Sequence, residues 1–330
     1  MILSSHIPSS ITDMAELRFG ILVLPDHVNF IDGNEYFQRI TQYIDSLDLT
    51  YDSIWIPDHL LPVSGGMKNR IDREEFRKGY FECLSLTSYL LPLYPNHKFG
   101  QIVLCNNFRN PALLAKISST LQVLSNGRFI LGLGAGWFPE EHKQYGFDYP
   151  SRRKRVERLD EAVKIIKMLW QDDDVTFNGK HYRIENAFCN PKPDPCPPIM
   201  IGGGGEKYTL KLVANYADWW NGAWYSVETW SHKLGVLANH CDDVGRDFDD
   251  LVKSALYGIS VASTDEDALR IAKNCPYYSN STYITGGPET LASSLGSLVD
   301  AGVEFFHLMF PQHKYIESAQ LFREKVVPLL

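Results

Sequence analysis

The sequence predicts a single (β/α)8 barrel, the TIM-barrel fold, on three observations. Eight short apolar runs of strand type occur along the chain, and most are followed by a segment with helical periodicity. Strands that alternate with helices are typical of a parallel sheet, and eight such units in roughly 300 residues fit a closed barrel better than an open sheet. No compositional break or low-complexity linker divides the chain. We therefore expect a loose N-terminal extension over residues 1–18 and one barrel domain over residues 19–330.

The first four strand–helix units are expected in the N-terminal half. Their strands are predicted at residues 19–24, 52–56, 99–104 and 128–133, and their helices at residues 35–47, 81–91, 111–124 and 151–170. Leu114, Ile117 and Leu121 recur at helical spacing in the third helix, and Gly127 follows where a glycine often ends a helix. Ser151 is a suitable N-cap for the fourth helix. A polar excursion, GGMKNRIDREEFRKG, separates the second strand from its helix.

A β-hairpin is expected before the fifth strand, outside the barrel. Asn178-Gly179 lies between two β-type triplets in VTFNGKHYR, and Asn-Gly is a typical hairpin turn. The proline-rich stretch PKPDPCPP then leads to a fifth strand at residues 199–201. The last three strands are predicted at residues 217–220, 256–262 and 303–309, with helices at about residues 207–217, 229–241, 265–274 and 288–301 and a closing helix that contains Phe322.

Composition narrows the class of partner. The chain has 330 residues and a formal net charge of −8, which argues against nucleic acid or an anionic membrane as the main partner. We expect no signal peptide and no membrane span, because the N-terminus has no basic start and no apolar run is long enough. The six cysteines contain no C-x-x-C pair and suit free thiols in a reducing cytoplasm. We therefore expect a cytoplasmic protein that acts on a small molecule and carries no metal site.

Two glycine-rich stretches follow predicted strands. LGLGAGWFPEEHKQYG has the pattern G-x-G-x-G, and Trp137-Phe138-Pro139 stands where a dinucleotide-binding turn would enter a helix, so we reject a dinucleotide site. Glycines at a barrel strand end either admit a flat ring or a phosphate, or only relieve crowding. The run from Gly202 to Gly205 separates a strand from a helix. It is the better phosphate candidate, because N–H groups at a helix N-terminus bind anions.

Four stretches resemble the bacterial luciferase-like superfamily of flavin and deazaflavin oxidoreductases. They are SIWIPDHL, CNNFRNPALLAK, GRFILGLGAGWFPEEHKQYGF and PPIMIGGGG with the following ADWWNG. The resemblance implies a (β/α)8 barrel with the cofactor ring at its C-terminal mouth, and often a homodimer. It implies hydride transfer between coenzyme F420 and a small organic substrate, or else FMN-dependent monooxygenation with O2. A non-catalytic flavin-binding protein stays open as a third hypothesis.

The resemblance also implies roles for particular residues. His59 is the candidate catalytic acid or base, although a histidine that only anchors a loop is the alternative. Trp137 stands where the sugar-phosphate dehydrogenases of the family carry a catalytic glutamate, which argues against that substrate. The implied cofactor contacts are Asp58, Cys105, Asn106, Gly134, Ala135, Gly136, Glu140 (with Glu141 beside it), Gly202, Gly203, Gly204 and Gly205, and the expected substrate-pocket residues are Trp137, Phe138 and Trp224.

Three further features are left open. A cis peptide is implied near residues 104–107, at the end of the third strand. The basic run from Arg152 to Arg155 is interpreted as a solvated helix face, with a contact to the F420 tail as the alternative. Arg109 is interpreted as structural, and Cys105 as a small packing residue rather than a nucleophile, because no basic partner is evident beside it.

Overall fold

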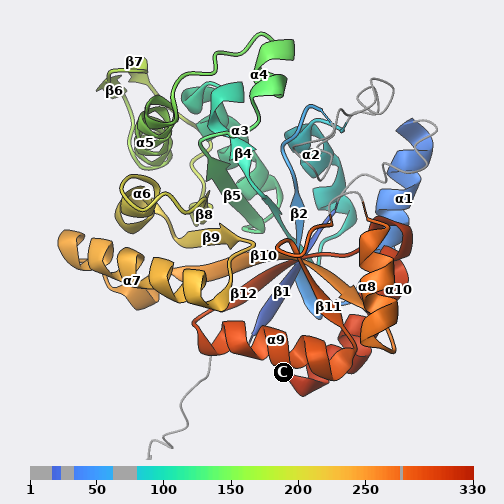
Figure 1. The fold of residues 1–330 in the computed structure, drawn as a ribbon. Coiled ribbons are helices and arrows are strands. Elements are labelled where there is room, and N and C mark those ends of the chain that lie inside the picture. The colour runs from blue at the N-terminus through green and yellow to red at the C-terminus, as the bar shows by residue number, and fades with distance from the viewer. Residues whose placement is uncertain (1–16, 24–32, 62–79, 276–277) are drawn as a thin grey trace, which may run out of the picture.

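Eight parallel strands form a closed barrel (Figure 1). The computed structural model describes residues 17–23, 33–61, 80–275 and 278–330. In ring order the strands are β1 (Arg18–Leu22), β2 (Tyr51–Ile56), β3 (Lys98–Gln101), β5 (Phe129–Gly134), β8 (Ile199–Gly202), β9 (Trp219–Ala223), β10 (Val252–Val261) and β12 (Phe305–Met309). The ring closes because β10 pairs with both β9 and β12, and β12 pairs with β1. The predicted (β/α)8 barrel is confirmed.

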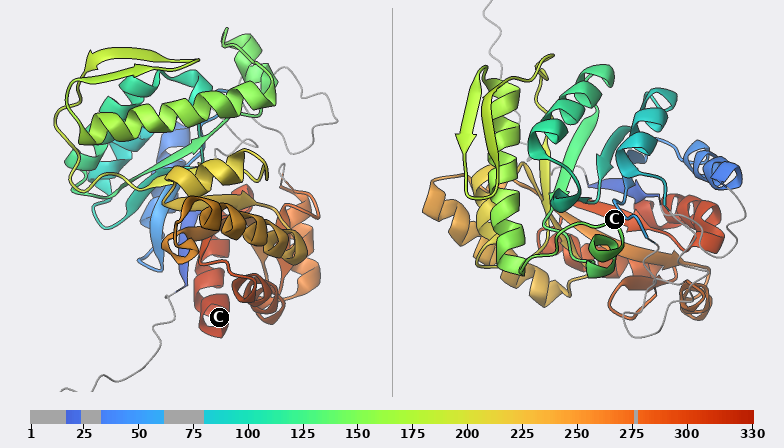
Figure 2. Two further views of the ribbon diagram at one scale, coloured as in Figure 1. Left: turned by 90° about the vertical axis from the view of Figure 1, so that its left-hand side faces the viewer. Right: turned by 90° about the horizontal axis from the view of Figure 1, so that it is seen from above.

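Helices surround the strands (Figures 1 and 2). Along the chain they are α1 (Gly33–Asp45), α2 (Cys83–Leu93), α3 (Pro111–Leu124), α5 (Arg152–Gln171), α6 (Thr209–Tyr216), α7 (Val227–Val244), α8 (Asp265–Lys273), α9 (Pro288–Asp300) and α10 (Tyr315–Leu321). The Asn110 side chain caps α3 by accepting hydrogen bonds from backbone N–H groups of its first turn. Ser151 caps α5 in the same way, as the sequence predicts. Apolar faces of these helices pack on the strands and form the main core.

The inside of the barrel is filled by side chains. The Trp55 indole lies across it, with its ring centroid 6.0 Å from that of Trp219 and 4.3 Å from that of His307. A Cβ atom on Gly20 or Gly100 would overlap the Trp55 ring, so these two strands carry glycine where the indole crosses. Because the interior is packed, a ligand site must lie above it, at the mouth formed by the carboxyl ends of the strands.

The hairpin lies outside the ring, as predicted, but its loop is longer. Strands β6 (Val175–Asn178) and β7 (Arg183–Ala187) pair with each other only, and Figure 2 shows them beside α5. Asn178 pairs with Arg183, so residues 179–182 form a four-residue loop instead of an Asn-Gly turn. The cause is Glu161 on α5, whose carboxylate accepts the N–H groups of residues 180–182 at 2.8 to 3.0 Å.

Several short elements differ from the prediction. The third strand, predicted at residues 99–104, is divided into β3 and β4 (Leu104–Cys105), and the sequence did not predict β11 (Tyr283–Gly286) or the short helix α4 (Pro139–Gln144). Strand β11 forms because β10 runs beyond the barrel and its second half needs a partner. Phe322 lies in the closing helical segment, as predicted, and begins a π-helical turn that directly continues α10. The Ile102–Val103 peptide is cis, two residues before the stretch in which a cis bond was implied.

The domain limits stay a prediction. Strand β1 begins at Arg18, one residue before the predicted start of the barrel domain. Residues 1–16 and the polar excursion at residues 65–79 lie outside the described residues. No helix in the described ranges is long and apolar enough to cross a membrane.

Candidate active site

The predicted site residues come from loops and strand ends at one mouth of the barrel. His59 follows β2, Cys105 ends β4, Gly134 ends β5, Gly202 ends β8 and Trp224 follows β9. Because all eight strands are parallel, their carboxyl ends meet at the same rim. The barrel therefore gathers side chains that are far apart in the sequence.

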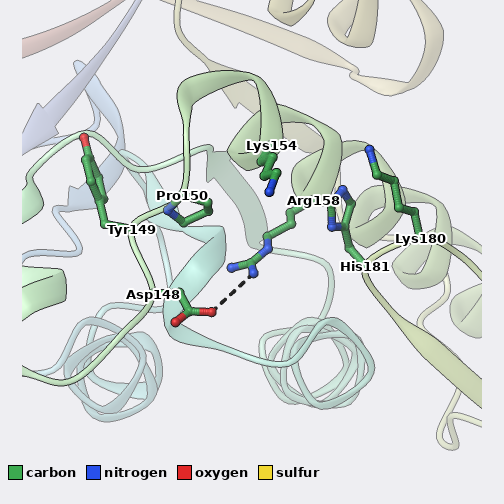
Figure 3. A pocket seen from close by; sticks show the side chains of 7 residues that line it. All are labelled: Asp148, Tyr149, Pro150, Lys154, Arg158, Lys180 and His181. Atoms are coloured by element: carbon green, nitrogen blue, oxygen red, sulfur yellow. Dashed lines mark hydrogen bonds and ion pairs between the residues drawn. The ribbon is translucent and has the colours of Figure 1, made fainter.

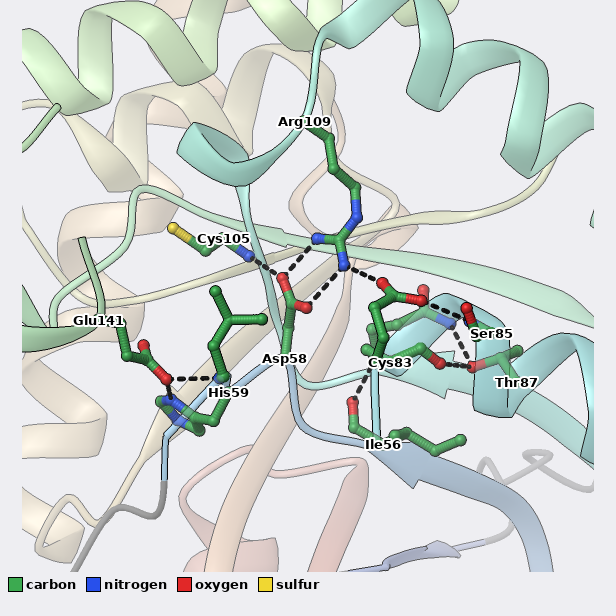
Figure 4. A network of polar contacts seen from close by, with 12 residues as sticks. Ile56, Asp58, His59, Cys83, Ser85, Thr87, Cys105, Arg109 and Glu141 are labelled. Atoms are coloured by element: carbon green, nitrogen blue, oxygen red, sulfur yellow. Dashed lines mark hydrogen bonds and ion pairs between the residues drawn. The ribbon is translucent and has the colours of Figure 1, made fainter. Parts of the chain in front are cut away.

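His59 is held by a buried carboxylate (Figure 4). Its Nδ1 atom lies 3.0 Å from Oε1 of Glu141, whose side chain is 3% exposed. The same oxygen accepts hydrogen bonds from the backbone N–H groups of Leu60 at 2.7 Å and Leu61 at 3.1 Å. The carboxylate that faces the histidine is thus Glu141, whereas Glu140 makes no hydrogen bond or ion pair with the described residues.

Aromatic rings surround the same histidine. The ring centroid of His59 lies 5.7 Å from Trp137, 6.3 Å from Phe138 and 5.9 Å from Tyr80. Trp137 stacks on Phe138 and is 48% exposed. In the described part of the chain, no protein atom forms a hydrogen bond with Nε2 of His59, and the side chain is 20% exposed. One ring nitrogen is therefore fixed and the other is available beside an apolar surface.

The carboxylate of Asp58 is bound by other groups of the protein (Figure 4). Its side chain is 1% exposed, and its two oxygens accept hydrogen bonds from the Arg109 guanidinium at 2.6 and 2.8 Å. It also accepts the Cys105 N–H at 2.8 Å, and Arg109 in turn pairs with Glu82. Burial by itself lowers the pKa of Arg109, but the hydrogen bonds and charge of Asp58 outweigh it and raise that pKa. Asp58 anchors β2 to the segment after β4, as expected for a structural Arg109; a contact of Asp58 with the cofactor stays a prediction.

Cys105 and Asn106 point into the protein. The Cys105 thiol lies 3.7 Å from Nε2 of His142, and burial raises the pKa of this thiol to about 12, so it stays protonated. Asn106 is 1% exposed and donates a hydrogen bond to the Tyr182 hydroxyl of the hairpin loop at 3.2 Å. Asn106 thus connects β4 to the hairpin, and the protonated Cys105 thiol is not arranged as a nucleophile.

The first glycine stretch is filled by the protein's own atoms. A Cβ atom on Gly132 would overlap the Gln101 carbonyl oxygen, and one on Gly134 would lie 2.6 Å from a methyl carbon of Val103. Gly136 has a φ of 75° and also faces the Cys105 sulfur, so it needs glycine on two grounds. Relief of crowding, one of the two alternatives from the sequence, accounts for these glycines. Ring contacts of Gly134, Ala135 and Gly136 stay predictions.

The second glycine stretch faces polar side-chain ends. A Cβ atom on Gly204 would overlap the Tyr225 hydroxyl. One on Gly205 would lie 2.9 Å from the Thr209 hydroxyl and 3.1 Å from Nη2 of Arg152. Gly203 has a φ of 117°, which favours glycine. A turn that opens onto a guanidinium and two hydroxyls suits an anion.

The basic run at the start of α5 has members with different roles. Arg155 is 8% exposed, donates hydrogen bonds to the carbonyl oxygens of Gly136 and Pro150, and lies over the Tyr149 ring. It therefore supports the loop after β5, contrary to a solvated face. Arg152 reaches the glycine turn, whereas Arg153 is exposed and pairs with Glu157 at 2.8 Å.

A pocket of about 450 Å3 lies between α5 and the hairpin loop (Figure 3). Its lining residues are Asp148, Tyr149, Pro150, Lys154, Arg158, Lys180 and His181. Lys180 pairs with Glu157 at 2.7 Å and Arg158 with Asp148 at 3.4 Å. Hydrogen bonds from Lys180, Arg153 and His181 lower the pKa of Glu157 to about 2. Because acids within the protein already pair with most of these cations, the mouth around His59 is the better site.

The fold is a packed (β/α)8 barrel, and its C-terminal mouth carries a histidine bound by a carboxylate and a glycine turn suited to an anion. These features are typical of a barrel enzyme whose active site is built from strand ends. The family model described as luciferase-like monooxygenase matches residues 17–317. The chain belongs to this family, as the resemblance implies, and it is an oxidoreductase.

Individual relatives cover most of the chain. An F420-dependent glucose-6-phosphate dehydrogenase of Amycolatopsis mediterranei (strain U-32) is 26% identical over 312 residues, which are 84% of this chain and 90% of the relative. An FMNH(2)-dependent dimethylsulfone monooxygenase of Pseudomonas fluorescens (strain Pf0-1) is 28% identical over 51% of this chain and 47% of its own length. The solved structure of an F420-dependent secondary alcohol dehydrogenase with an F420-acetone adduct superposes with a TM-score of 0.77 and 19% identity, over 95% of this chain and 99% of that one. F420 and FMN, the two cofactors expected from the sequence, are those of these relatives.

Proposed function

We propose that this protein transfers hydride between coenzyme F420 and a small organic alcohol or carbonyl compound. The observation that carries the proposal is His59, with Nδ1 bound by Glu141 and Nε2 available at the mouth of the barrel. A group that gives or takes a proton beside a hydride-transferring cofactor is what interconversion of an alcohol and a carbonyl requires. The F420-dependent relatives support this choice.

The glycine turn after β8 fits the phosphate of such a cofactor. The turn at Gly204 and Gly205 faces the Tyr225 hydroxyl, and Arg152 supplies a positive charge beside it, whereas the Gly203 N–H already donates to the Asn221 carbonyl oxygen. We place the cofactor phosphate there and keep Gly134, Ala135 and Gly136 as expected neighbours of its ring. When bound, F420 supplies or accepts the hydride. The chain's own part is to bind the phosphate, shield the site from water and move one proton at Nε2 of His59.

The aromatic surface beside His59 indicates the substrate class. Trp137 and Phe138 stack beside the histidine and offer no charged group to a sugar phosphate. In the oxidative direction Nε2 accepts the proton of the substrate hydroxyl, and in the reductive direction it donates a proton to the carbonyl oxygen. We therefore propose a substrate with an apolar substituent next to its reacting carbon.

The proposal also covers the cellular location, the oligomeric state and the second candidate reaction. All six cysteines are free, which supports a reducing cytoplasm. A homodimer stays a prediction, supported by the exposed side chains of Leu113 and Leu124 on α3. FMN-dependent monooxygenation is the second candidate, because the monooxygenase from Pseudomonas fluorescens matches half of the chain.

Cofactor titration tests the proposal first. The purified protein is titrated with F420, which absorbs at about 420 nm, and with FMN, which absorbs at about 450 nm. We expect F420 to bind more tightly and to be reduced by a panel of small secondary alcohols. Tighter binding of FMN, with oxygen-dependent turnover of the reduced flavin, would favour monooxygenation. A bound cofactor that no donor reduces or oxidises would favour the non-catalytic binder.

Two matched arginine variants test the phosphate site. Arg152→Met removes the guanidinium at the glycine turn and should raise the dissociation constant for F420 by about 10- to 100-fold, the usual effect of losing a charge-assisted hydrogen bond. Arg153→Met removes the neighbouring charge, which pairs with Glu157, and should leave that constant within about twofold. Equal effects of the two variants would mean that the phosphate binds elsewhere.

A further inference from the structure

Three nitrogen atoms lie within hydrogen-bonding distance of one oxygen of Glu141. Oε1 lies 2.7 Å from the Leu60 nitrogen, 3.1 Å from the Leu61 nitrogen and 3.0 Å from Nδ1 of His59. Two of these nitrogens belong to backbone N–H groups, which have no alternative protonation state. They fix Oε1 as an acceptor, because a hydrogen on this oxygen would point at an N–H group.

The position of the hydrogen on the imidazole ring of His59 follows from that constraint. With Oε1 fixed as an acceptor, Nδ1 of His59 must carry the hydrogen that joins the two side chains. The neutral imidazole then has its lone pair on Nε2, the nitrogen that no described protein atom binds. Histidine tautomers are set in this way by the hydrogen bond that the other ring nitrogen makes.

We propose that Glu141 is a positioning residue that holds His59 in the Nδ1–H tautomer, so that Nε2 faces the substrate as the base in oxidation. The activity part of this inference rests on the proposed function, while the tautomer itself does not. Glu141 lies on α4 and is buried, so its carboxylate cannot turn away to solvent. The loop at Leu60 and Leu61 is held by the same oxygen, which couples the orientation of the ring to that of the loop after β2.

The structure also predicts which substitution of Glu141 keeps the hydrogen bond to Nδ1 of His59. In Glu141→Gln the two backbone N–H groups require the carbonyl oxygen, and not the NH2 group, at the position of Oε1. The amide therefore still accepts from Nδ1 of His59, and only the negative charge is lost. In Glu141→Leu the three donors lose their acceptor, so the tautomer is no longer specified.

NMR spectroscopy tests the tautomer without cofactor or substrate. The protein is labelled with 15N-histidine, and His59 is assigned by the signal that disappears in His59→Asn. At alkaline pH, where imidazole is neutral, we expect Nδ1 to carry the proton in the wild type and in Glu141→Gln, and a mixture of tautomers in Glu141→Leu. A wild-type His59 protonated on Nε2, or an unchanged tautomer in a folded Glu141→Leu, would overturn the inference. If Glu141→Leu does not fold, the wild-type spectrum still decides.

Kinetics then test what the tautomer contributes. We expect Glu141→Leu to lower kcat by about 10^2- to 10^4-fold with a smaller change in KM, and Glu141→Gln to stay within about tenfold of wild type. Lys143→Ala, at an exposed position of the same helix, should turn over like the wild type. Correct tautomers without turnover of any F420 substrate would contradict the proposed function alone. Full activity of a folded Glu141→Leu would contradict the role of Glu141 alone.

Discussion

Arg109→Met should destabilise the fold strongly, because it leaves a buried carboxylate without its cation. Asp58 is 1% exposed and receives two hydrogen bonds from Arg109, at 2.6 and 2.8 Å. Breaking a buried pair by removing one partner costs about 3 to 5 kcal/mol, since the remaining charge is neither solvated nor paired. The Cys105 N–H stays on Asp58 but supplies only one neutral donor. We expect a loss of about 3 kcal/mol or more in the free energy of unfolding.

Asp58→Asn should be milder, because Arg109 keeps Glu82 as a partner. We expect a loss of about 1 to 3 kcal/mol for this variant. The double variant should be more stable than the sum of the two single effects by about 0.5 to 3 kcal/mol, the usual coupling of residues in direct contact. Arg270→Met is the matched control, because Arg270 pairs with Asp267 at 2.6 Å but is 72% exposed, and its loss should change stability by less than about 0.5 kcal/mol.

Urea unfolding followed by tryptophan fluorescence measures these differences, and cofactor titration of the folded variants accompanies it. If the free energy of unfolding of Arg109→Met lies within about 0.5 kcal/mol of the wild-type value, the ion pair does not anchor the loop after β2. If Asp58→Asn instead keeps its stability and loses cofactor affinity, the cofactor contact implied by the family resemblance holds and the structural role of Asp58 is wrong.

Three further predictions follow from single residues. His59→Asn should lower turnover by about 10^2- to 10^4-fold with cofactor affinity nearly intact, as stopped-flow measurement of both half-reactions would show; wild-type rates would leave His59 only a loop-anchoring role, and in a monooxygenase the variant would instead release hydrogen peroxide. Gly204→Val should push aside the Tyr225 hydroxyl and weaken cofactor binding at least about tenfold, more than it lowers stability; an unchanged dissociation constant in a folded variant would place the phosphate elsewhere. Burial lowers the pKa of His307 to about 3, so the native state keeps this ring neutral while the unfolded chain binds a proton below about pH 6.5. The free energy of unfolding should therefore fall as the pH is lowered from about 6.5 to about 3, by up to about 1.4 kcal/mol per pH unit. Urea titrations of His307→Leu should show a shallower slope over this range.

Local patterns in the sequence were enough to predict the barrel. Strands such as β2 and β5 contain short apolar runs, and burial on both faces of a parallel sheet makes such runs stand out. Strand β11 escaped detection although Tyr283 and Ile284 are residues of strand type, because its pairing depends on how far β10 extends. The hairpin turn was misjudged for a similar reason, since the acceptor that holds its loop is Glu161 on another element.

The site residues that the sequence could predict are those that adjoin strand ends. His59 and the glycine run at residues 202–205 adjoin strand ends, so the fold alone places them at the mouth. Glu141 could not be separated from Glu140 without the helical phase of α4, for which Pro139 at the first helical position was the available signal. Arg152 and Tyr225 reach the glycine turn from α5 and from the end of β9, and nothing local indicates this.

The two glycine stretches both follow barrel strands and differ in what fills the space beside them. Next to Gly132 and Gly134 the space is taken by a backbone carbonyl and by Val103, which offer an anion no donor. Next to Gly204 and Gly205 it is taken by the ends of the Tyr225 and Arg152 side chains, which are donors that can move by rotation of their own bonds. The first stretch lets the strands approach, and the side-chain ends beside the second suit the proposed phosphate site. For this reason we expect substitutions in the second stretch to change cofactor affinity, and substitutions in the first to change stability.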